Sequence, residues 1–203
     1  IAGTVIRVLT CGITIDSDAC SGAMVTIAAG ESWDGVVARA IGEGWIGLEA
    51  LSGIPGSVGA TPIQNVGAYG QEVSQTIASV RTYDRYDRSI RTIAAADCGF
   101  TYRSSRFKAE PQRYVVLSVT FQLKLGDLGA PIAYAELART LGVELGERAP
   151  AAEVREAVLA LRRGKGMVLD PDDHDTWSAG SFFTNPLLTA GEAGALPPEA
   201  PRF

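Results

Sequence analysis

The chain has 203 residues, of which 46% are hydrophobic and 20% charged, and its formal net charge is −5. This composition predicts a folded core rather than disorder, and the length allows one large domain or two small ones. The negative charge without a basic block disfavours nucleic acid as a partner, and no apolar run approaches the ~20 residues of a membrane span.

The three cysteines, Cys11, Cys20 and Cys98, are odd in number and form no Cys-x-x-Cys pair. They are most simply free thiols, so we expect a cytoplasmic protein without a signal peptide and without a metal site. The single histidine, His174, lies in a run of aspartates. We expect it at the surface, since nothing nearby marks it as a catalytic base.

In chain order, the first pattern is an apolar stretch over residues 1–9, which is typical of a strand entered midway in a chain that does not open on Met. We therefore expect a fragment of a longer protein. Residues 23–30 predict a strand and residues 32–43 a helix, with Ser32 as its cap and Gly42 or Gly44 at its end. The apolar face of this helix would consist of Val36, Val37, Ala40 and Ile41.

A glycine-rich segment, residues 53–70, follows the predicted helix. Its five glycines and two prolines exclude an ordinary helix or central strand, while its apolar residues would be wasted in a polar linker. Backbone with so few side chains suits close approach to a ligand, because amides can then point at phosphate oxygens. The segment matches neither the Walker loop nor the Rossmann fingerprint. A tight loop that only reverses the chain is the alternative, but the hydroxyl and amide side chains in the segment favour a binding loop.

The remaining patterns predict an α+β fold. Residues 77–84 and 89–94 are expected to pair around a polar turn at residues 84–88. Within residues 115–125, the alternation of apolar and polar residues from Leu117 to Leu125 predicts a half-buried strand. Residues 126–131 are expected to form an exposed loop. Helical periodicity over residues 151–163 predicts a helix that Gly164 can end, with Arg162 away from its apolar stripe. Asp- and Pro-rich residues 169–176 are a plausible domain boundary.

Three segments together resemble a known family. They are the glycine-rich segment, the basic motif Gly-Phe-Thr-Tyr-Arg-Ser-Ser-Arg-Phe-Lys at residues 99–108, and the serine motif Ser-Ala-Gly-Ser-Phe-Phe-Thr-Asn-Pro at residues 178–186. In this order they closely resemble the UDP-N-acetylenolpyruvoylglucosamine reductase family, which makes a peptidoglycan precursor. The resemblance runs over essentially the whole chain.

The resemblance implies an FAD-binding lobe of the type shared with vanillyl-alcohol-oxidase-like flavoenzymes, at residues 1–165, and the start of a substrate-binding domain at residues 166–203. It also implies that FAD, reduced by NADPH, gives hydride to UDP-N-acetylglucosamine-enolpyruvate to form UDP-N-acetylmuramate. Two family features, an amino-terminal Gly-Gly-Gly-Ser-Asn loop and a late catalytic glutamate, do not occur in this sequence. No obligate protein partner is indicated.

For catalysis, the resemblance implies Arg103 and Ser181. A fixed guanidinium at Arg103 would stabilise the negative charge that hydride addition pushes onto the substrate carboxylate, and Ser181 would donate the proton. A solvated surface arginine and a loop serine are the alternatives. No Gly-x-Ser-x-Gly elbow surrounds Ser181, so a nucleophilic serine is not supported.

The same resemblance assigns binding roles to further residues. Those expected at FAD are Gly53, Gly56, Ser57, Val58, Gly59, Thr61, Gln64, Asn65, Gly67, Tyr69 and Tyr102. Those expected at the nucleotide substrate are Tyr134, Lys165 and Asn185. Core packing is the alternative for the three tyrosines, with Tyr134 then packing inward at a helix start. A helix-end cation and a turn residue are the alternatives for Lys165 and Asn185.

Two rival functions follow from the same sequence. One is a different flavoenzyme of the same broad fold, although such enzymes are not expected to carry the serine motif. The other is a flavin- or nucleotide-binding module without catalytic activity, because two expected catalytic features are missing from the sequence.

Overall fold

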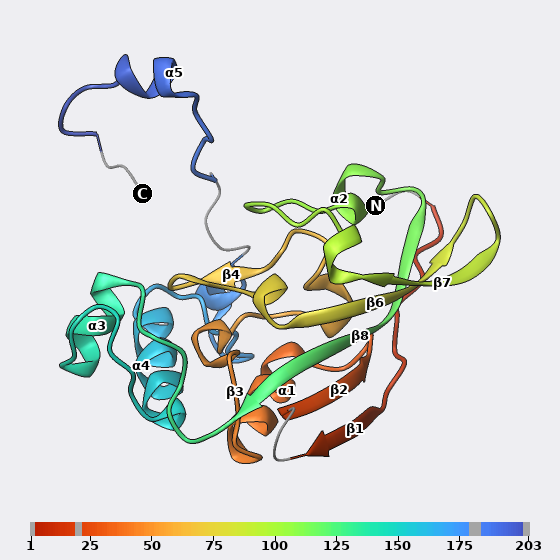
Figure 1. Cartoon of the computed structure of the whole chain (residues 1–203), viewed down its shortest axis with the longest axis horizontal. Helices are drawn as coiled ribbons and strands as arrows, with labels where there is room; N and C mark the ends of the chain where they lie inside the picture. Colours follow the sequence, from red (N-terminus) through yellow and green to blue (C-terminus); the bar gives the residue numbers. More distant parts are fainter. Residues whose placement is uncertain (1–2, 19–21, 179–183, 201–203) are drawn as a thin grey trace.

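An antiparallel sheet of six strands forms the centre of the described part of the chain (Figure 1). The computed structural model describes residues 3–18, 22–178 and 184–200. The strand order is β1-β2-β8-β6-β7, and β3 pairs with β8 beside this path. The long strand β8, Tyr114–Leu125, lies between β2 and β6 and holds the sheet together.

The other strands of this sheet are β1 (Ile13–Asp18), β2 (Gly22–Ala28), β3 (Trp45–Ile46), β6 (Ile77–Asp84) and β7 (Ser89–Ala94). A separate hairpin consists of β4 (Gly67–Ala68) and β5 (Gln71–Glu72). The α-helices are α1 (Trp33–Gly42), α2 (Arg106–Ala109), α3 (Ala135–Leu141), α4 (Ala151–Arg163) and α5 (Ala190–Gly194). Short 3-10 turns are η1 (Glu49–Leu51), η2 (Val58–Ala60), η3 (Val73–Gln75), η4 (Ala95–Asp97) and η5 (His174–Thr176).

The predictions with clear periodicity are confirmed. The pair β6 and β7 has the expected bounds, α4 spans the expected residues 151–163, and Gly164 caps it. Helix α1 buries Val36, Val37 and Ala40, and the left-handed Gly44 (φ +70°) follows its end. The predicted strand at residues 23–30 starts and stops slightly earlier, as β2.

Two local predictions are wrong and a third is largely confirmed. The described residues of the 1–9 stretch form no strand, because β1 takes the edge position beside β2 instead. Ser32 is the residue before α1, but its side chain makes no capping bond. The expected loop at residues 126–131 is exposed apart from buried Gly129 and half-buried Ala130.

The main core lies between one face of the sheet and α1. Trp33 of α1 packs against Phe121 of β8 with ring centroids 5.9 Å apart, and its indole N–H donates to the Leu51 carbonyl. Val58 of the glycine-rich segment is also fully buried in this core. The apolar anchors of the segment therefore fix it to the sheet, which positions the site described below.

A second, smaller cluster lies between α3, α4 and η1. Its buried members are Ala50, Ile132, Leu137, Ala138, Ala149, Val154 and Val158, and Tyr69 packs against it. Through Tyr69, this cluster holds α3 and α4 against the glycine-rich segment. None of the helices in the described part of the chain is both long and apolar enough to cross a membrane.

Helices α1 and α4 are joined by an ion pair. Both Asp34 carboxylate oxygens accept from Arg155, at 2.7 and 2.9 Å, and the Gly53 N–H donates to the same carboxylate. The hydrogen bonds from Arg155 hold the pKa of Asp34 below its usual value. The pair is partly exposed, so solvent screens the attraction between its charges and limits its contribution to the stability of the fold.

We expect Asp34→Asn to lower the free energy of unfolding at pH 7 by about 1 kcal/mol. Because the pKa of Asp34 is lowered in the folded state, its contribution is present above the pKa of the unfolded chain and is lost as the pH falls through the folded value. Urea unfolding of both forms from pH 7 to pH 3.5 should show the difference narrowing below about pH 4. A difference that stays constant over this range would contradict the assignment.

Candidate functional site

The glycine-rich segment and the basic motif lie side by side, although the residues bonded between them are 36 to 42 positions apart along the chain. Three side chains join them, and each donates to a backbone carbonyl across the junction. The bonds run from Ser105 Oγ to Ile63 (2.5 Å), from Asn65 Nδ2 to Thr101 (3.1 Å) and from Arg103 Nη2 to Gly67 (2.7 Å). Two of the three segments that carry the family resemblance thus form one surface.

Arg103 is held firmly in this surface. Its guanidinium lies over the Tyr102 ring at 5.1 Å, and its own carbonyl accepts from Lys108 Nζ. It is half-buried rather than fully solvated. Gly67 allows the close approach, since a Cβ there would lie 2.7 Å from Arg103 Nη1. The arrangement fixes a cation beside the bare backbone of β4.

Backbone strain is concentrated here. In the described part of the chain, the non-glycine residues with positive φ are Asn65 (+46°), Tyr69 (+49°), Arg88 (+54°) and Arg103 (+53°). All except Arg88, which lies in the β6–β7 turn, belong to the candidate site. Such conformations cost energy and persist where the surrounding contacts enforce them, often at functional sites.

Tyr69, Tyr134 and Lys165 form a second group, the tyrosine–lysine cluster. The two rings meet edge to face at 5.5 Å, and Lys165 Nζ lies 5.9 Å from the centre of the Tyr69 ring. Lys165 also pairs with Glu136 of α3 at 2.8 Å, which raises the pKa of the lysine, while burial raises the pKa of the Tyr69 phenol. The structure thus brings Tyr69, predicted at the flavin, together with Tyr134 and Lys165, predicted at the substrate.

The contacts of this cluster do not match inward packing of Tyr134 or a helix-end role for Lys165. Tyr134 precedes α3 and is 42% exposed, so it does not pack inward at the helix start. Lys165 follows α4, but its Nζ pairs with Glu136 rather than with the carbonyls that end its own helix. Tyr69 is half-buried between the second core cluster and the tyrosine–lysine cluster. The cluster leaves two aromatic edges and a cation at one surface.

The start of the glycine-rich segment uses several of its amides inside the chain. The N–H groups of Gly53, Val58 and Gly59 donate to Asp34 Oδ1, the Glu31 carbonyl and the Ala29 carbonyl. A Cβ at Gly59 would lie 2.6 Å from that of Ala29, so this glycine serves close packing against the residue that follows β2. Gly56 differs, because it is exposed and has φ +116°. No heavy atom would lie within 4 Å of a Cβ at this position.

The polar side chains of the segment divide in a similar way. Thr61 is buried and donates to the Val58 carbonyl, and buried Asn65 also donates to Glu72 and accepts from the Ser74 N–H. Ser57 is half-buried and Gln64 is exposed. Thr61 and Asn65 therefore support the shape of the segment, whereas Gln64 and the Gly56–Ser57 turn face outward.

Arg162 belongs to the same neighbourhood but was not singled out from the sequence. It is half-buried under the segment, with Nη2 donating to the Met167 carbonyl and Nε near the point where a Gly53 Cβ would be. Nε is a buried donor without a hydrogen-bond partner among the described residues, and burial lowers the pKa of the guanidinium. Arg162 lies three residues before Lys165, on the same side of the helix end. This spacing is the sequence signal that could have identified Arg162 as a site residue.

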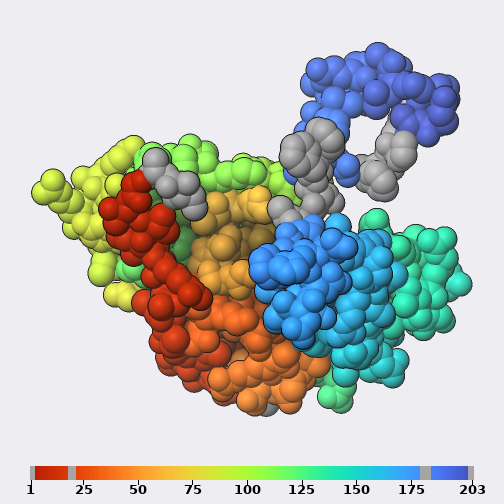
Figure 2. Space-filling model, turned by 180° about the vertical axis from the view of Figure 1, so that it is seen from behind, coloured from red at the N-terminus to blue at the C-terminus, as the bar shows by residue number. Residues whose placement is uncertain are grey.

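One predicted residue, Ser181, lies outside the described residues. Asn185 is exposed in the carboxyl-terminal segment, residues 184–200, which stands away from the sheet in two opposite views (Figures 1 and 2). His174 is exposed as expected, with its ring 4.7 Å from that of Trp177.

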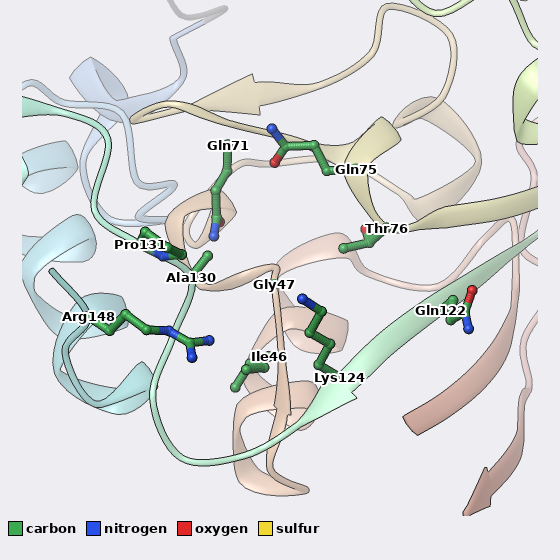
Figure 3. A pocket seen from close by; sticks show the side chains of 10 residues that line it. All are labelled: Ile46, Gly47, Gln71, Gln75, Thr76, Gln122, Lys124, Ala130, Pro131 and Arg148. Atoms are coloured by element: carbon green, nitrogen blue, oxygen red, sulfur yellow. The ribbon is translucent and has the colours of Figure 1, made fainter. Parts of the chain in front are cut away.

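A pocket of about 200 Å³ lies elsewhere, between β3, β8 and the loop after β8 (Figure 3). It is smaller than the ~300 Å³ at which small-molecule sites usually begin. Its lining residues are Ile46, Gly47, Gln71, Gln75, Thr76, Gln122, Lys124, Ala130, Pro131 and Arg148. None of the predicted site residues is among them.

The residues of the candidate site suit a dinucleotide cofactor. Exposed Gly56 can be approached closely, Arg162 has an unused buried donor next to Gly53, and Arg103 supplies positive charge. Diphosphates are held in proteins by such combinations of bare backbone and a few fixed cations. The chemistry of the donors therefore fits a flavin with its diphosphate.

Comparison with known proteins agrees with this chemistry. Residues 2–92 match the family model described as an FAD binding domain. The chain is 62% identical over 201 residues to the UDP-N-acetylenolpyruvoylglucosamine reductase of Cutibacterium acnes, covering 99% of this chain and 53% of that protein. It is 60% identical over 196 residues to the protein of the same name from Streptomyces avermitilis, covering 96% and 52%. The chain spans about half the length of the curated relatives it matches.

Among solved structures, the chain is similar to UDP-N-acetylenolpyruvylglucosamine reductase from Thermus caldophilus, with a TM-score of 0.49 and 23% sequence identity. That match covers 70% of this chain and 43% of that one.

Proposed function

Since this chain belongs to the UDP-N-acetylenolpyruvoylglucosamine reductase family, we propose that it contributes to the reduction of UDP-N-acetylglucosamine-enolpyruvate by NADPH, with FAD as the cofactor. The product is UDP-N-acetylmuramate, a precursor of peptidoglycan. The observation that carries the proposal is the fixed position of Arg103 on the carbonyl of Gly67. It unites the basic motif and the glycine-rich segment in one surface.

A bound flavin supplies the hydride in this reaction, and the protein supplies position and charge. Hydride addition to the enolpyruvyl double bond drives negative charge onto the substrate carboxylate. Arg103 would stabilise this charge through paired hydrogen bonds, because its guanidinium is planar and is already oriented by Tyr102 and Gly67. A preoriented donor loses little energy to reorganisation during the reaction.

Ser181 would then donate the proton that completes the reduction. A serine hydroxyl is a weak acid and needs help from neighbouring charge or water. This role for Ser181 rests on the serine motif alone. We also propose that residues 1–165 form an FAD-binding lobe and that residues 166–203 begin a substrate-binding domain.

The tyrosine–lysine cluster would hold the nucleotide part of the substrate. Lys165 would meet the diphosphate and Tyr134 would cover it, since both lie at the same surface as Tyr69. Asn185 would contribute an amide contact from the carboxyl-terminal segment. Exposed Gly56, half-buried Ser57, Gln64, Tyr69 and Tyr102 are proposed as direct contacts to FAD, and the other residues of the glycine-rich segment as their support.

UDP-N-acetylglucosamine-enolpyruvate and NADPH are the only partners that the proposal requires. The negative net charge gives no reason to add nucleic acid. A cytoplasmic location fits a reaction that consumes NADPH and a nucleotide sugar, and it also fits the free Cys11 and Cys98.

The full-length protein gives the direct test. Purified protein should be yellow, NADPH should bleach the flavin absorbance, and UDP-N-acetylglucosamine-enolpyruvate should restore it with formation of UDP-N-acetylmuramate. A protein that takes up no FAD during reconstitution, or whose bleached form is not reoxidised by this substrate, would refute the proposal.

A substitution of Lys165 tests the assignment of the substrate diphosphate. Lys165→Met keeps the aliphatic stem but removes the charge, so the KM for UDP-N-acetylglucosamine-enolpyruvate should rise about tenfold with little change in kcat. Steady-state kinetics at two salt concentrations should also show a weaker salt dependence of KM in the variant. Arg139→Met, at an exposed position of α3, is the control and should leave KM unchanged.

A further inference from the structure

A buried carboxylate that has no role in the mechanism above lies behind the tyrosine–lysine cluster. Glu49 of η1 is only 1% exposed. It accepts hydrogen bonds from the Gly47 N–H at 2.7 Å, from the Gln71 side chain at 3.1 Å and from the Ala130 N–H. All three partners are donors, so the position requires a group with acceptors only, which a carboxylate is and an amide is not.

Gln71 extends this network toward the glycine-rich segment. It is 7% exposed, and its side-chain oxygen accepts from the Ala50 N–H at 2.8 Å while its nitrogen donates to Glu49. In the β4–β5 hairpin Gln71 pairs with Ala68, the residue just before Tyr69. The network therefore reaches the backbone that presents Tyr69.

The other end of the network reaches the segment that presents Tyr134. Figure 3 shows the Gln71 side chain pointing toward Ala130, four residues before Tyr134. Gly129 permits this approach, because a Cβ there would lie 2.8 Å from Glu49 Oε1. Glu49 thus binds the chain at residues 129–130 on one side and, through Gln71, the β4–β5 hairpin on the other.

We propose that Glu49 and Gln71 are positioning residues that set the edge-to-face pair of Tyr69 and Tyr134, and through it the substrate surface beside Lys165. The two tyrosines come from separate segments, and the network connects both segments through buried hydrogen bonds. Losing one partner would leave a buried N–H unpaired, which is costly. The consequence for substrate binding rests on the function proposed above, whereas the coupling of the two segments does not.

The coupling is tested by hydrogen exchange on the full-length protein carrying Glu49→Gln. The amides of residues 127–141 should exchange about tenfold faster than in the unsubstituted protein, because the new NH2 group would face a backbone N–H. Asp84→Asn is the matched control. Asp84 is also a fully buried carboxylate that accepts from backbone N–H groups and an arginine, but it serves the β6–β7 hairpin. Unchanged exchange of residues 127–141 in Glu49→Gln would overturn the proposal.

The effect on binding is tested by the kinetics of the same variants. Glu49→Gln and Gln71→Met should each raise the KM for UDP-N-acetylglucosamine-enolpyruvate about tenfold while kcat changes little, and Asp84→Asn should not. Because Glu49 acts through Tyr134, Glu49→Gln and Tyr134→Ala combined should raise KM by less than the product of the single effects. Fully multiplicative effects would reject the positioning role. If the unsubstituted protein fails to reduce this substrate, the proposed function fails, and the exchange experiment alone decides the coupling.

Discussion

Arg103→Ala should lower the turnover of UDP-N-acetylglucosamine-enolpyruvate on the order of 100-fold or more. The substitution removes the group proposed to stabilise the charge that develops on the substrate carboxylate. The guanidinium is oriented before substrate binds, by the Gly67 carbonyl at 2.7 Å and by the Tyr102 ring. An oriented donor contributes mainly to the transition state, so the loss should fall on kcat and on kcat/KM alike.

Two controls separate this role from a loss of folding. Arg103→Lys keeps the charge but not the planar fork, so it should recover only part of the activity. Arg85→Ala removes an exposed arginine of the β6–β7 turn, which donates to the Gln112 carbonyl, and should leave turnover unchanged. Steady-state kinetics on the full-length protein, with thermal unfolding of each variant, would measure both. Normal turnover in Arg103→Ala would place this residue outside the active centre.

Ser181→Ala should separate the two halves of the reaction. If Ser181 is the proton donor, its loss should lower formation of UDP-N-acetylmuramate by about 10²- to 10⁴-fold. Bleaching of the flavin absorbance by NADPH should survive, because that half does not use the proton. Rapid-mixing measurements of each half separately would show this contrast.

The other serine of the same motif offers a control for Ser181. Ser178→Ala changes the same kind of side chain three residues earlier and should leave both halves near normal. If product formation in Ser181→Ala proceeds at the normal rate, the assignment of the proton donor is wrong. If both halves slow equally, Ser181 supports cofactor binding rather than proton transfer.

Local periodicity explains which elements could be read from the sequence. The alternation in β8 and the 3.6-residue period of α4 each reflect burial on one side, so their bounds follow from the residues themselves. The stretch at residues 1–9 has comparable apolar content, but strand formation depends on a partner, and β1 occupies the position next to β2. The short hairpin of β4 and β5 has too few residues to show any period.

The sequence by itself determined that a glycine-rich segment, a basic motif and a serine motif occur in the order of one reductase family, and that strands and helices mix in an α+β fold. The clustering of glycines and the periodicity of apolar residues are properties of short stretches of sequence, so they can be recognised without the fold. Only the tertiary structure decided that Asn65 and Thr61 support the segment from within, that Arg162 lies beneath it, and that Glu49 is buried against Gln71. Whether a polar side chain faces a ligand or the interior depends on partners brought in from distant residues, and those contacts leave no pattern in the chain around it.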